Sequence, residues 1–381
     1  MPTARFGQWL YLLDDGGLVY SESQNRFVGL DMAGVLAYRA FDKGSNPDDL
    51  QGFGRAISDT KKLNMQIIFG LSRGQFPDTK ADDRLKIAQL DLKQKGVFTV
   101  HHLPILFAAT DGIDTELCRD CFKSCPSAME SARFHLQILN IESCLAICVN
   151  GQEMLRVPNS EQVGLGLLHV VRSLLYNEVD YDVAFHAAMI GDGRYALMLC
   201  APRESGKSTL AAYLTGHNYS FITDEPALLR LDTTCIAPVE MPISLKEGSW
   251  VSLKDEWPQL AVAPIHRRSD GRRLKFLHPP KDSVASASQR LTHILFPKYS
   301  PSSPPQIKAV STMQKFALLN EGGMLFNRQF SKNKFEQFLE LICATPAFSI
   351  TYSSFQEAEQ LVHNVLSRRS VTESVNEPAG C

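Results

Sequence analysis

The segment LCAPRESGKSTLAAYL, residues 199–214, decides how the chain folds, because an apolar run gives way there to a helical pattern. The apolar run ALMLC precedes Gly206, Lys207 and Ser208, and the amphipathic run STLAAYL follows. A small-residue loop that enters a helix in this way aligns backbone N–H groups, which bind phosphate oxygens. The segment therefore predicts an α/β fold with a phosphate-binding loop between a strand and a helix.

This loop departs from the pattern G-x-x-x-x-G-K-[ST] at its first position, where Ala201 replaces glycine. Alanine matters there only if the backbone needs a positive φ, which costs on the order of 1 kcal/mol. Lys207 is expected to reach the β and γ phosphates, and Ser208 to bind Mg²⁺. The residues expected to bind ATP are Ala201, Arg203, Glu204, Ser205, Gly206, Lys207, Ser208 and Thr209. The alternative is a chance Gly-Lys-Ser that opens an ordinary helix.

Two acidic residues follow the helix in the segment YSFITDEPALL, where Asp224 stands seventeen residues beyond Lys207. A second strand would carry Asp224 and Glu225 to its carboxyl end, where ligands of open α/β sheets bind. Both carboxylates could then reach Mg²⁺ or an attacking hydroxyl group. The alternative is a surface Asp-Glu pair after a strand.

The segment FHAAMIGDGRYALMLCAPRESGKSTLAAYLTGHNYSFITDEPALL resembles the core of the bacterial HPr serine kinases. It is more closely similar to the HPr-kinase-related proteins of biosynthetic gene clusters. The similarity extends through MPISLKEGSW and LHPPKDSV, and more weakly through TPAFSITYSSFQEAEQLV, so that it covers roughly residues 150–365. It implies a kinase core with a phosphate loop, which uses ATP and Mg²⁺.

The resemblance assigns a role to each matching residue. Lys207 would bind the phosphates, and Ser208, with Asp224 and Glu225, would hold the metal. Asp224 would also take the proton from the acceptor hydroxyl. His186 would lie near the transferred phosphate, although a histidine on an apolar strand is more often a core residue.

One acidic residue of the family is missing here. HPr kinases carry a later glutamate in a Glu-x-Arg-Gly signature, and the nearest match in this chain is the run SLK at residues 244–246. Either Glu225 substitutes for it or catalysis is weakened. The segment HRRSDGRRLKFLHPPK adds a basic loop that could clamp phosphates or an acidic peptide, with a solvated basic face as the alternative. The candidate substrate-binding residues are Lys246, Arg267, Arg268, Arg272, Arg273 and Lys275.

The first 70 residues predict a separate small module. Short strands are expected in FGQWLYLL, GLVYSES and RFVGL, followed by helices in MAGVLAYRAF and within residues 48–69. The stretch LDMAG at residues 30–34 resembles a turn of the small peptide-binding chaperone domain first known from pyrroloquinoline quinone biosynthesis. The resemblance implies a winged-helix-like module that binds the leader of a ribosomally made precursor peptide. A structural cap on the kinase core is the alternative.

Taken together, these patterns divide the chain into four expected parts. Residues 1–70 form the module, 71–150 a linker with a mixed α/β subdomain, 151–365 the kinase-like core, and 366–381 a flexible tail. Strands are expected across 91–156. An apolar stripe after residue 162 predicts a helix, and Gly191-Asp192-Gly193 predicts a hairpin turn.

Composition excludes several classes of function. The net charge is −2, so no global field favours nucleic acid or an anionic membrane. No run of about 20 apolar residues or secretory signal is present, which predicts a cytoplasmic protein. The nine scattered cysteines predict free thiols. Cys118, Cys121 and Cys125 could instead bind zinc or an iron–sulfur cluster, if Cys144 and Cys148 approach them.

These features predict a kinase that transfers phosphate from ATP to a serine or threonine hydroxyl of a peptide or protein, with a ribosomally made precursor peptide as the expected acceptor. One rival is a nucleotide-binding chaperone that presents a peptide without phosphorylating it. Another is a kinase for a small metabolite. The sequence leaves open the acceptor, the preferred nucleotide, reversibility and the oligomeric state, a homo-oligomer included.

Overall fold

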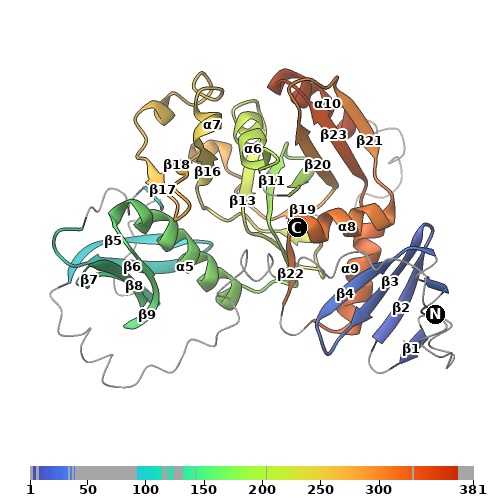
Figure 1. The fold of residues 1–381 in the computed structure, drawn as a ribbon, viewed down its shortest axis with the longest axis horizontal. Coiled ribbons are helices and arrows are strands. Elements are labelled where there is room, and N and C mark those ends of the chain that lie inside the picture. Colours follow the sequence, from blue (N-terminus) through green and yellow to red (C-terminus); the bar gives the residue numbers. More distant parts are fainter. Residues whose placement is uncertain are drawn as a thin grey trace.

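The computed structural model has a mixed α/β fold with five β-sheets and six α-helices among the residues that it describes (Figure 1). The described residues are 3–5, 8–32, 35, 36, 38, 92–113, 118, 120–122, 132–141, 143–202, 204–327 and 330–367. Within them, no helix has the length and apolar character that a membrane span requires. The expected α/β class is confirmed at this level.

A six-stranded sheet in the order β13-β11-β12-β20-β23-β21 is formed by strands between residues 187 and 352. Its strands are β11 (Ala187–Gly191), β12 (Ala196–Cys200), β13 (Ser220–Asp224), β20 (His293–Tyr299), β21 (Gln306–Ala309) and β23 (Ala347–Tyr352). Strands β12, β20 and β23 are parallel, and β13 shares their direction because β11 is antiparallel to both β12 and β13. The carboxyl ends of these four strands therefore lie at one edge of the sheet.

Strand β12 is buried on both faces, and its side chains alternate between two cores. Leu197 and Leu199 pack with helices α6 and α10, whereas Met198 and Cys200 pack with α8 and α9. The helices are α6 (Lys207–Thr215), α8 (Thr312–Gly322), α9 (Lys332–Ala344) and α10 (Phe355–Ser367). The sheet is therefore covered by helices on each face.

Two smaller sheets adjoin the central one. The first has the order β19-β15-β14-β10-β22 and the second the order β16-β18-β17. Their strands are β10 (Val183–Phe185), β14 (Ala227–Leu229), β15 (Cys235–Ile236), β16 (Ile243–Lys246), β17 (His266–Arg267), β18 (Arg273–Leu277), β19 (Gln289–Arg290) and β22 (Met324–Phe326). Short helices follow at α7 (Glu247–Trp250), η4 (Pro258–Ala261) and η5 (Lys281–Ser283).

A five-stranded sheet forms from the region predicted to hold strands between 91 and 156. Its strands are β5 (Lys93–Val100), β6 (Leu103–Ala109), β7 (Phe134–Ile141), β8 (Cys144–Val149) and β9 (Gln152–Val157). A 3-10 turn η3 (Ser160–Gln162) leads into helix α5 (Val163–Glu178), whose apolar residues pack on this sheet. Both the strands and the helix were predicted from periodicity and are confirmed.

The amino-terminal strands form a four-stranded antiparallel sheet. They are β1 (Thr3–Arg5), β2 (Gln8–Leu13), β3 (Gly16–Ser21) and β4 (Arg26–Leu30). The strands predicted there are confirmed. The helix predicted over residues 32–41 is described only at residues 32, 35, 36 and 38, and the one within 48–69 lies outside the described residues.

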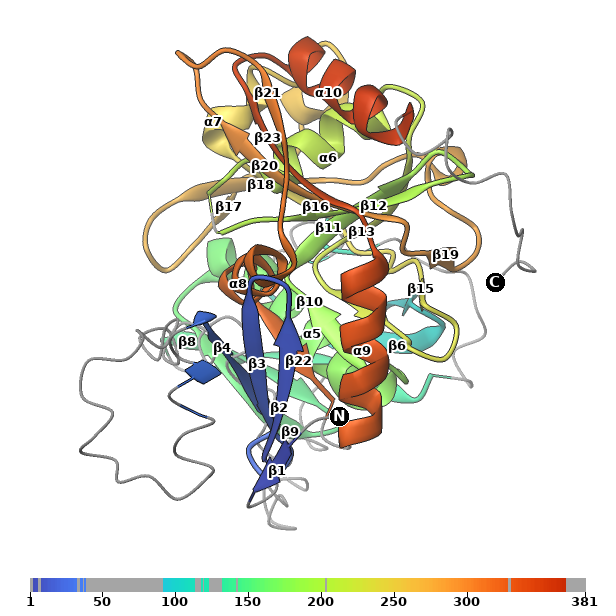
Figure 2. The same ribbon diagram turned by 90° about the vertical axis from the view of Figure 1, so that its right-hand side faces the viewer.

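This amino-terminal sheet shares an aromatic core with the carboxy-terminal helices, and both views show it against α9 (Figures 1 and 2). The rings of Tyr20 and Phe335 stack with centroids 4.2 Å apart, and Tyr20 Oη donates a hydrogen bond of 2.9 Å to the carbonyl of Phe330. Asp15 accepts hydrogen bonds from the Ser311 hydroxyl and the Met313 N–H at the start of α8. The sheet is therefore packed into the fold.

Two local predictions have different outcomes. The hairpin between β11 and β12 is confirmed, because Asp192 Oδ1 accepts the N–H groups of Arg194 and Tyr195 in the turn. The expectation of free thiols is wrong for Cys235, which is disulfide-bonded. Among the described residues, Cys144, Cys148, Cys200 and Cys343 carry free thiols.

Replacing Phe335 by alanine should lower the free energy of unfolding by about 3–5 kcal/mol, because it leaves a cavity against Tyr20. Urea denaturation measures this loss. Hydrogen exchange should also become faster in β2 and β3, since their support on α9 is removed. Gln337→Ala, on the exposed side of the same helix, is the matched control. Unchanged exchange in β2 and β3 would show that the sheet does not depend on this contact.

Candidate functional site

The predicted strand, loop and helix are present, since β12 leads through residues 201–206 into α6. Gly206 has a φ of +91° and Glu204 a φ of +71°, so both adopt the left-handed conformation. Ala201 does not have a positive φ, and the alanine that replaces the first glycine therefore imposes no such strain. Arg203 lies outside the described residues.

Glu204 is an unusual residue for its position. A glutamate in the left-handed conformation costs roughly 1 kcal/mol relative to glycine. Its carboxylate forms an ion pair with Arg272 and lies 3.6 Å from Lys246 Nζ. Two cations from other segments therefore neutralise an acidic side chain within the loop.

Lys207, the first residue of α6, is only 8% exposed. Its ammonium group donates hydrogen bonds to the carbonyls of Ala201 and, at 3.2 Å, Pro202. Burial lowers the pKa of Lys207, and the nearby Cys200, Asp224 and Glu225 partly counteract that effect. The lysine is thus bound to the backbone of its own loop.

Ser208 and Asp224, sixteen residues apart in the sequence, are in direct contact. The Ser208 hydroxyl donates to Asp224 Oδ1 at 3.0 Å, and the N–H of Ser244 donates to Asp224 Oδ2 at 3.2 Å. Asp224 ends β13 and is buried. Thr209, half-buried, follows on the first turn of α6. A hydroxyl and a carboxylate therefore meet beside the loop.

Glu225 and His186 also lie close together, as expected. His186 Nδ1 is 2.8 Å from Glu225 Oε1. The backbone of Glu225 is left-handed, with a φ of +62°. Strained residues of this kind cluster at functional sites.

Arg172 joins this group and was missed in the sequence. Its Nη1 lies 3.2 Å from Glu225 Oε1, and the two side chains are 18% and 19% exposed. Its Nε atom is buried without a hydrogen-bond partner. The available signal was a single charge within the apolar run HVVRSLL of α5, far from the loop in sequence. Only the fold brings α5 to β13.

The two adjacent carboxylates have opposite pKa shifts. Burial raises the pKa of Asp224, and Glu225 raises it further, whereas Ser208, Ser244 and His186 lower it in part. Burial also raises the pKa of Glu225, but Arg172 and His186 outweigh it and hold that pKa well below its ordinary value. Glu225 therefore stays ionised, and Asp224 binds a proton more readily than an exposed aspartate.

The basic residues of the segment 266–275 divide between several partners. Arg272 reaches the loop through Glu204, whereas Arg273 pairs with Glu247. Arg267 pairs with Glu161, and Arg268 with Asp270 at 3.4 Å. Lys275 is buried, and its ammonium group donates to the carbonyls of Leu260 and Ala261. Of the six candidate substrate-binding residues, the structure brings Lys246 and Arg272 to the loop through Glu204.

The cysteine cluster is only partly described. Cys118 and Cys121 are buried, and Cys121 Sγ lies 3.4 Å from the carbonyl oxygen of Gly164. Asp120 between them pairs with His266 Nε2 at 2.8 Å. Cys125 lies outside the described residues. In the part of the chain that the structure describes, no group of three or more His, Cys, Asp or Glu side chains is arranged to hold a metal ion.

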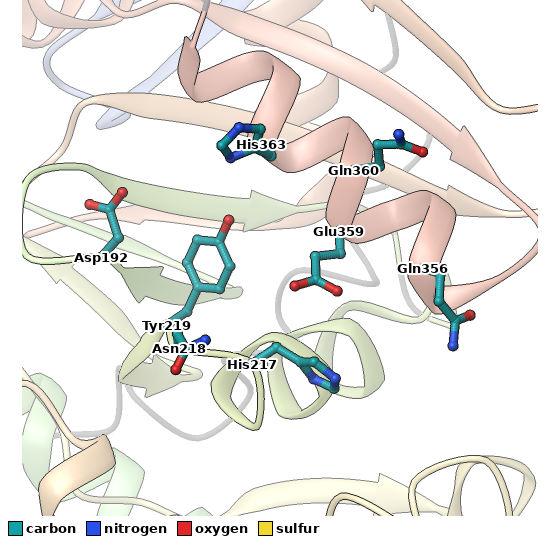
Figure 3. A pocket seen from close by; sticks show the side chains of 8 residues that line it. All are labelled: Asp192, His217, Asn218, Tyr219, Gln356, Glu359, Gln360 and His363. Carbon is teal, nitrogen blue, oxygen red and sulfur yellow. The ribbon is translucent and has the colours of Figure 1, made fainter.

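A shallow polar depression of about 470 Å³ lies at the opposite end of α6 from the loop (Figure 3). Its side chains come from α10, from the turn after α6 and from the β11–β12 turn. They are Asp192, His217, Asn218, Tyr219, Gln356, Glu359, Gln360 and His363. None of these is a predicted site residue, and we place the candidate site at the loop, where the buried ionisable groups converge.

Comparison with known proteins assigns no family. No protein-family model matches the chain, and no curated protein sequence matches it.

The Arg172–Glu225 pair should stabilise the fold in a pH-dependent manner. Because the pKa of Glu225 is depressed by folding, its contribution is present above its ordinary pKa of 4.5 and is lost as the pH falls below that value. Arg172→Met should cost about 1–3 kcal/mol at pH 7, since it removes the guanidinium from a largely buried carboxylate and leaves only His186 as its partner. The difference from the unmodified protein should shrink in acid.

Urea unfolding from pH 7 to pH 3.5 measures this difference. Arg133→Met is the control, because the Arg133 side chain is 63% exposed in its pair with Glu178 and exposed pairs contribute little. A loss that is the same at every pH would mean that Arg172 stabilises through packing and not through its charge.

Proposed function

We propose that the chain is an ATP-dependent kinase that phosphorylates a serine or threonine hydroxyl of a peptide or protein, with Mg²⁺ as its metal cofactor. The contact of 3.0 Å between Ser208 Oγ and Asp224 Oδ1, beside the loop, carries the proposal. A hydroxyl and a carboxylate are the side-chain ligands with which phosphate-loop enzymes hold Mg²⁺. The buried Lys207 adds a cation at the same place.

The residues around the loop fit a nucleoside triphosphate. The first N–H groups of α6 have no acceptor within the helix, and the Ser205 hydroxyl is buried without a partner. These donors suit phosphate oxygens, and Lys207 Nζ would exchange its two loop carbonyls for such oxygens. Mg²⁺ held by Ser208 and Asp224 would supply neutralising charge.

In the proposed reaction, the acceptor oxygen forms a bond to the γ phosphorus while the bond to ADP breaks. Asp224 accepts the hydroxyl proton in this scheme, because its carboxylate lies at the end of β13 beside the loop. Glu225 is already paired with Arg172 and His186, so it acts in this scheme as a positioning residue and not as a metal ligand. His186 and Arg172 remain beside the transferred group.

The amino-terminal sheet is the proposed binding surface for the acceptor. An extended leader segment of a ribosomally made precursor peptide would add to this sheet as a further strand, as the resemblance of residues 30–34 implies. Leader binding would supply energy away from the reacting hydroxyl. A small-metabolite kinase would leave this sheet without a binding role.

The main rival is a nucleotide-binding protein that presents a peptide and transfers no phosphate. Glu204 favours it, because a negative charge within the loop repels phosphate oxygens. The pairs of Glu204 with Arg272 and Lys246 favour the kinase, since they neutralise that charge. Binding and transfer must therefore be measured separately.

Lys207→Ala should weaken ATP binding by about 2 kcal/mol or more, roughly 30-fold, because it removes charge-assisted hydrogen bonds to the phosphates. Isothermal titration calorimetry with ATP and Mg²⁺ measures this change. Lys308→Ala, an exposed lysine on β21, should bind as tightly as the unmodified protein. If all three proteins bind ATP with equal affinity, the loop does not bind the nucleotide.

Asp224→Asn should slow phosphoryl transfer by roughly 10²-fold or more, because the amide cannot accept the hydroxyl proton. The assay follows the label from γ-labelled ATP to candidate precursor peptides at saturating ATP and Mg²⁺. As a control, the affinity of this variant for ATP without Mg²⁺ should stay within a few-fold of that of the unmodified protein, which would show that the loop is intact. Transfer at the normal rate by the Asn variant would exclude Asp224 as the base. ATP binding without transfer to any peptide would favour the presenting protein.

A further inference from the structure

The edge of the central sheet has two chemically different sides. The loop after β12 lies between them, with Asp224 of β13 on one side and the ends of β20 and β23 on the other. The first side holds the ionisable groups of the candidate site. The second ends in two tyrosines, Tyr299 and Tyr352, which are paired across the parallel strands.

Tyr299 differs sharply from its neighbour in exposure. Its side chain is 54% exposed, whereas Tyr352 is 1% exposed. Their ring centroids are 5.9 Å apart. A Cβ atom placed on Gly206 would lie 3.4 Å from Tyr352 Oη and 3.9 Å from Tyr299 Cβ, so both tyrosines adjoin the loop. Tyr299 is thus an exposed aromatic residue whose Cβ atom lies directly beside the loop.

The backbone at Tyr299 is held firmly. Ser300 N–H donates to the carbonyl of Tyr352 at 2.8 Å, and the hydroxyls of Ser300 and Ser303 are 2.7 Å apart in the turn that follows. Tyr299 therefore presents its ring from a fixed strand end, and little ordering is needed when a ligand binds.

We propose that Tyr299 is the platform on which the base of the bound nucleotide stacks. This inference rests on the proposed function, in which the loop holds the phosphates and Asp224 faces the transferred end. The base then extends from the opposite end of the phosphates, toward β20 and β23. An aromatic ring there binds any base through its π face, so ATP and GTP should bind with similar affinity.

The test compares ATP with inorganic tripolyphosphate, which has the same phosphates and no base. Both are titrated with Mg²⁺ into the full chain and into Tyr299→Ala, Tyr299→Trp and Tyr219→Ala. Tyr219 lines the polar depression at the far end of α6 and serves as the control (Figure 3). Tyr299→Ala should lose about 10-fold or more in ATP affinity, the order expected for one stacked base. Tripolyphosphate affinity should not change.

The Tyr299→Trp variant should keep ATP affinity, and its fluorescence should respond to ATP but not to tripolyphosphate. Equal weakening of both ligands by Tyr299→Ala would assign Tyr299 to loop support and overturn the base platform. Unchanged ATP binding by that variant would overturn it as well. If the unmodified protein binds tripolyphosphate as tightly as ATP, the base platform fails and the phosphate site stands. If the unmodified protein binds neither ATP nor tripolyphosphate, both the proposed function and the base platform are wrong.

Discussion

The burial of strand β12 on both faces is the constraint on which the rest of the structure depends. A strand covered on each side needs helices above and below, which α6 with α10 and α8 with α9 provide. The chain leaves β12 at the carboxyl edge of the sheet, and the loop 201–206 connects it there to α6, one of the covering helices. The amino-terminal sheet in turn covers α8 and α9, and its position follows from theirs.

Charge balance explains why so many ionisable groups tolerate burial around the loop. Glu225 carries a lasting negative charge because Arg172 and His186 surround it. That charge in turn raises the pKa of the adjacent Asp224, and it partly restores the charged form of the buried Lys207. Each group sets the protonation of the next, as is typical of sites that bind or move charge. A substitution at one of these residues should therefore change the protonation of the others as well.

Local signals predicted much of the fold and site, because periodicity and turn residues act over short distances. The strand and helix around Gly206, the hairpin at Asp192 and the position of Asp224 at the end of a strand followed from local sequence patterns. Arg172 could not be found in this way, since only tertiary packing brings α5 to β13. The burial of Lys275 could not be predicted for the same reason. Its basic neighbours suggested an exposed loop, whereas its ammonium nitrogen lies 4.9 Å from the centre of the Trp250 ring and donates to the carbonyl of Leu260.

The stacking of Tyr20 on Phe335 has a consequence for how an acceptor would be selected. A binding surface on a flexible tether lets any hydroxyl within reach arrive at the loop. Here the amino-terminal sheet and the central sheet share one core through α8 and α9, so the distance between them is set by the fold. On the proposed function, a peptide bound along that sheet would present only residues at a certain number of positions beyond its leader. The acceptor hydroxyl would then be selected by its distance from the leader along the peptide, and not by the residues that flank it.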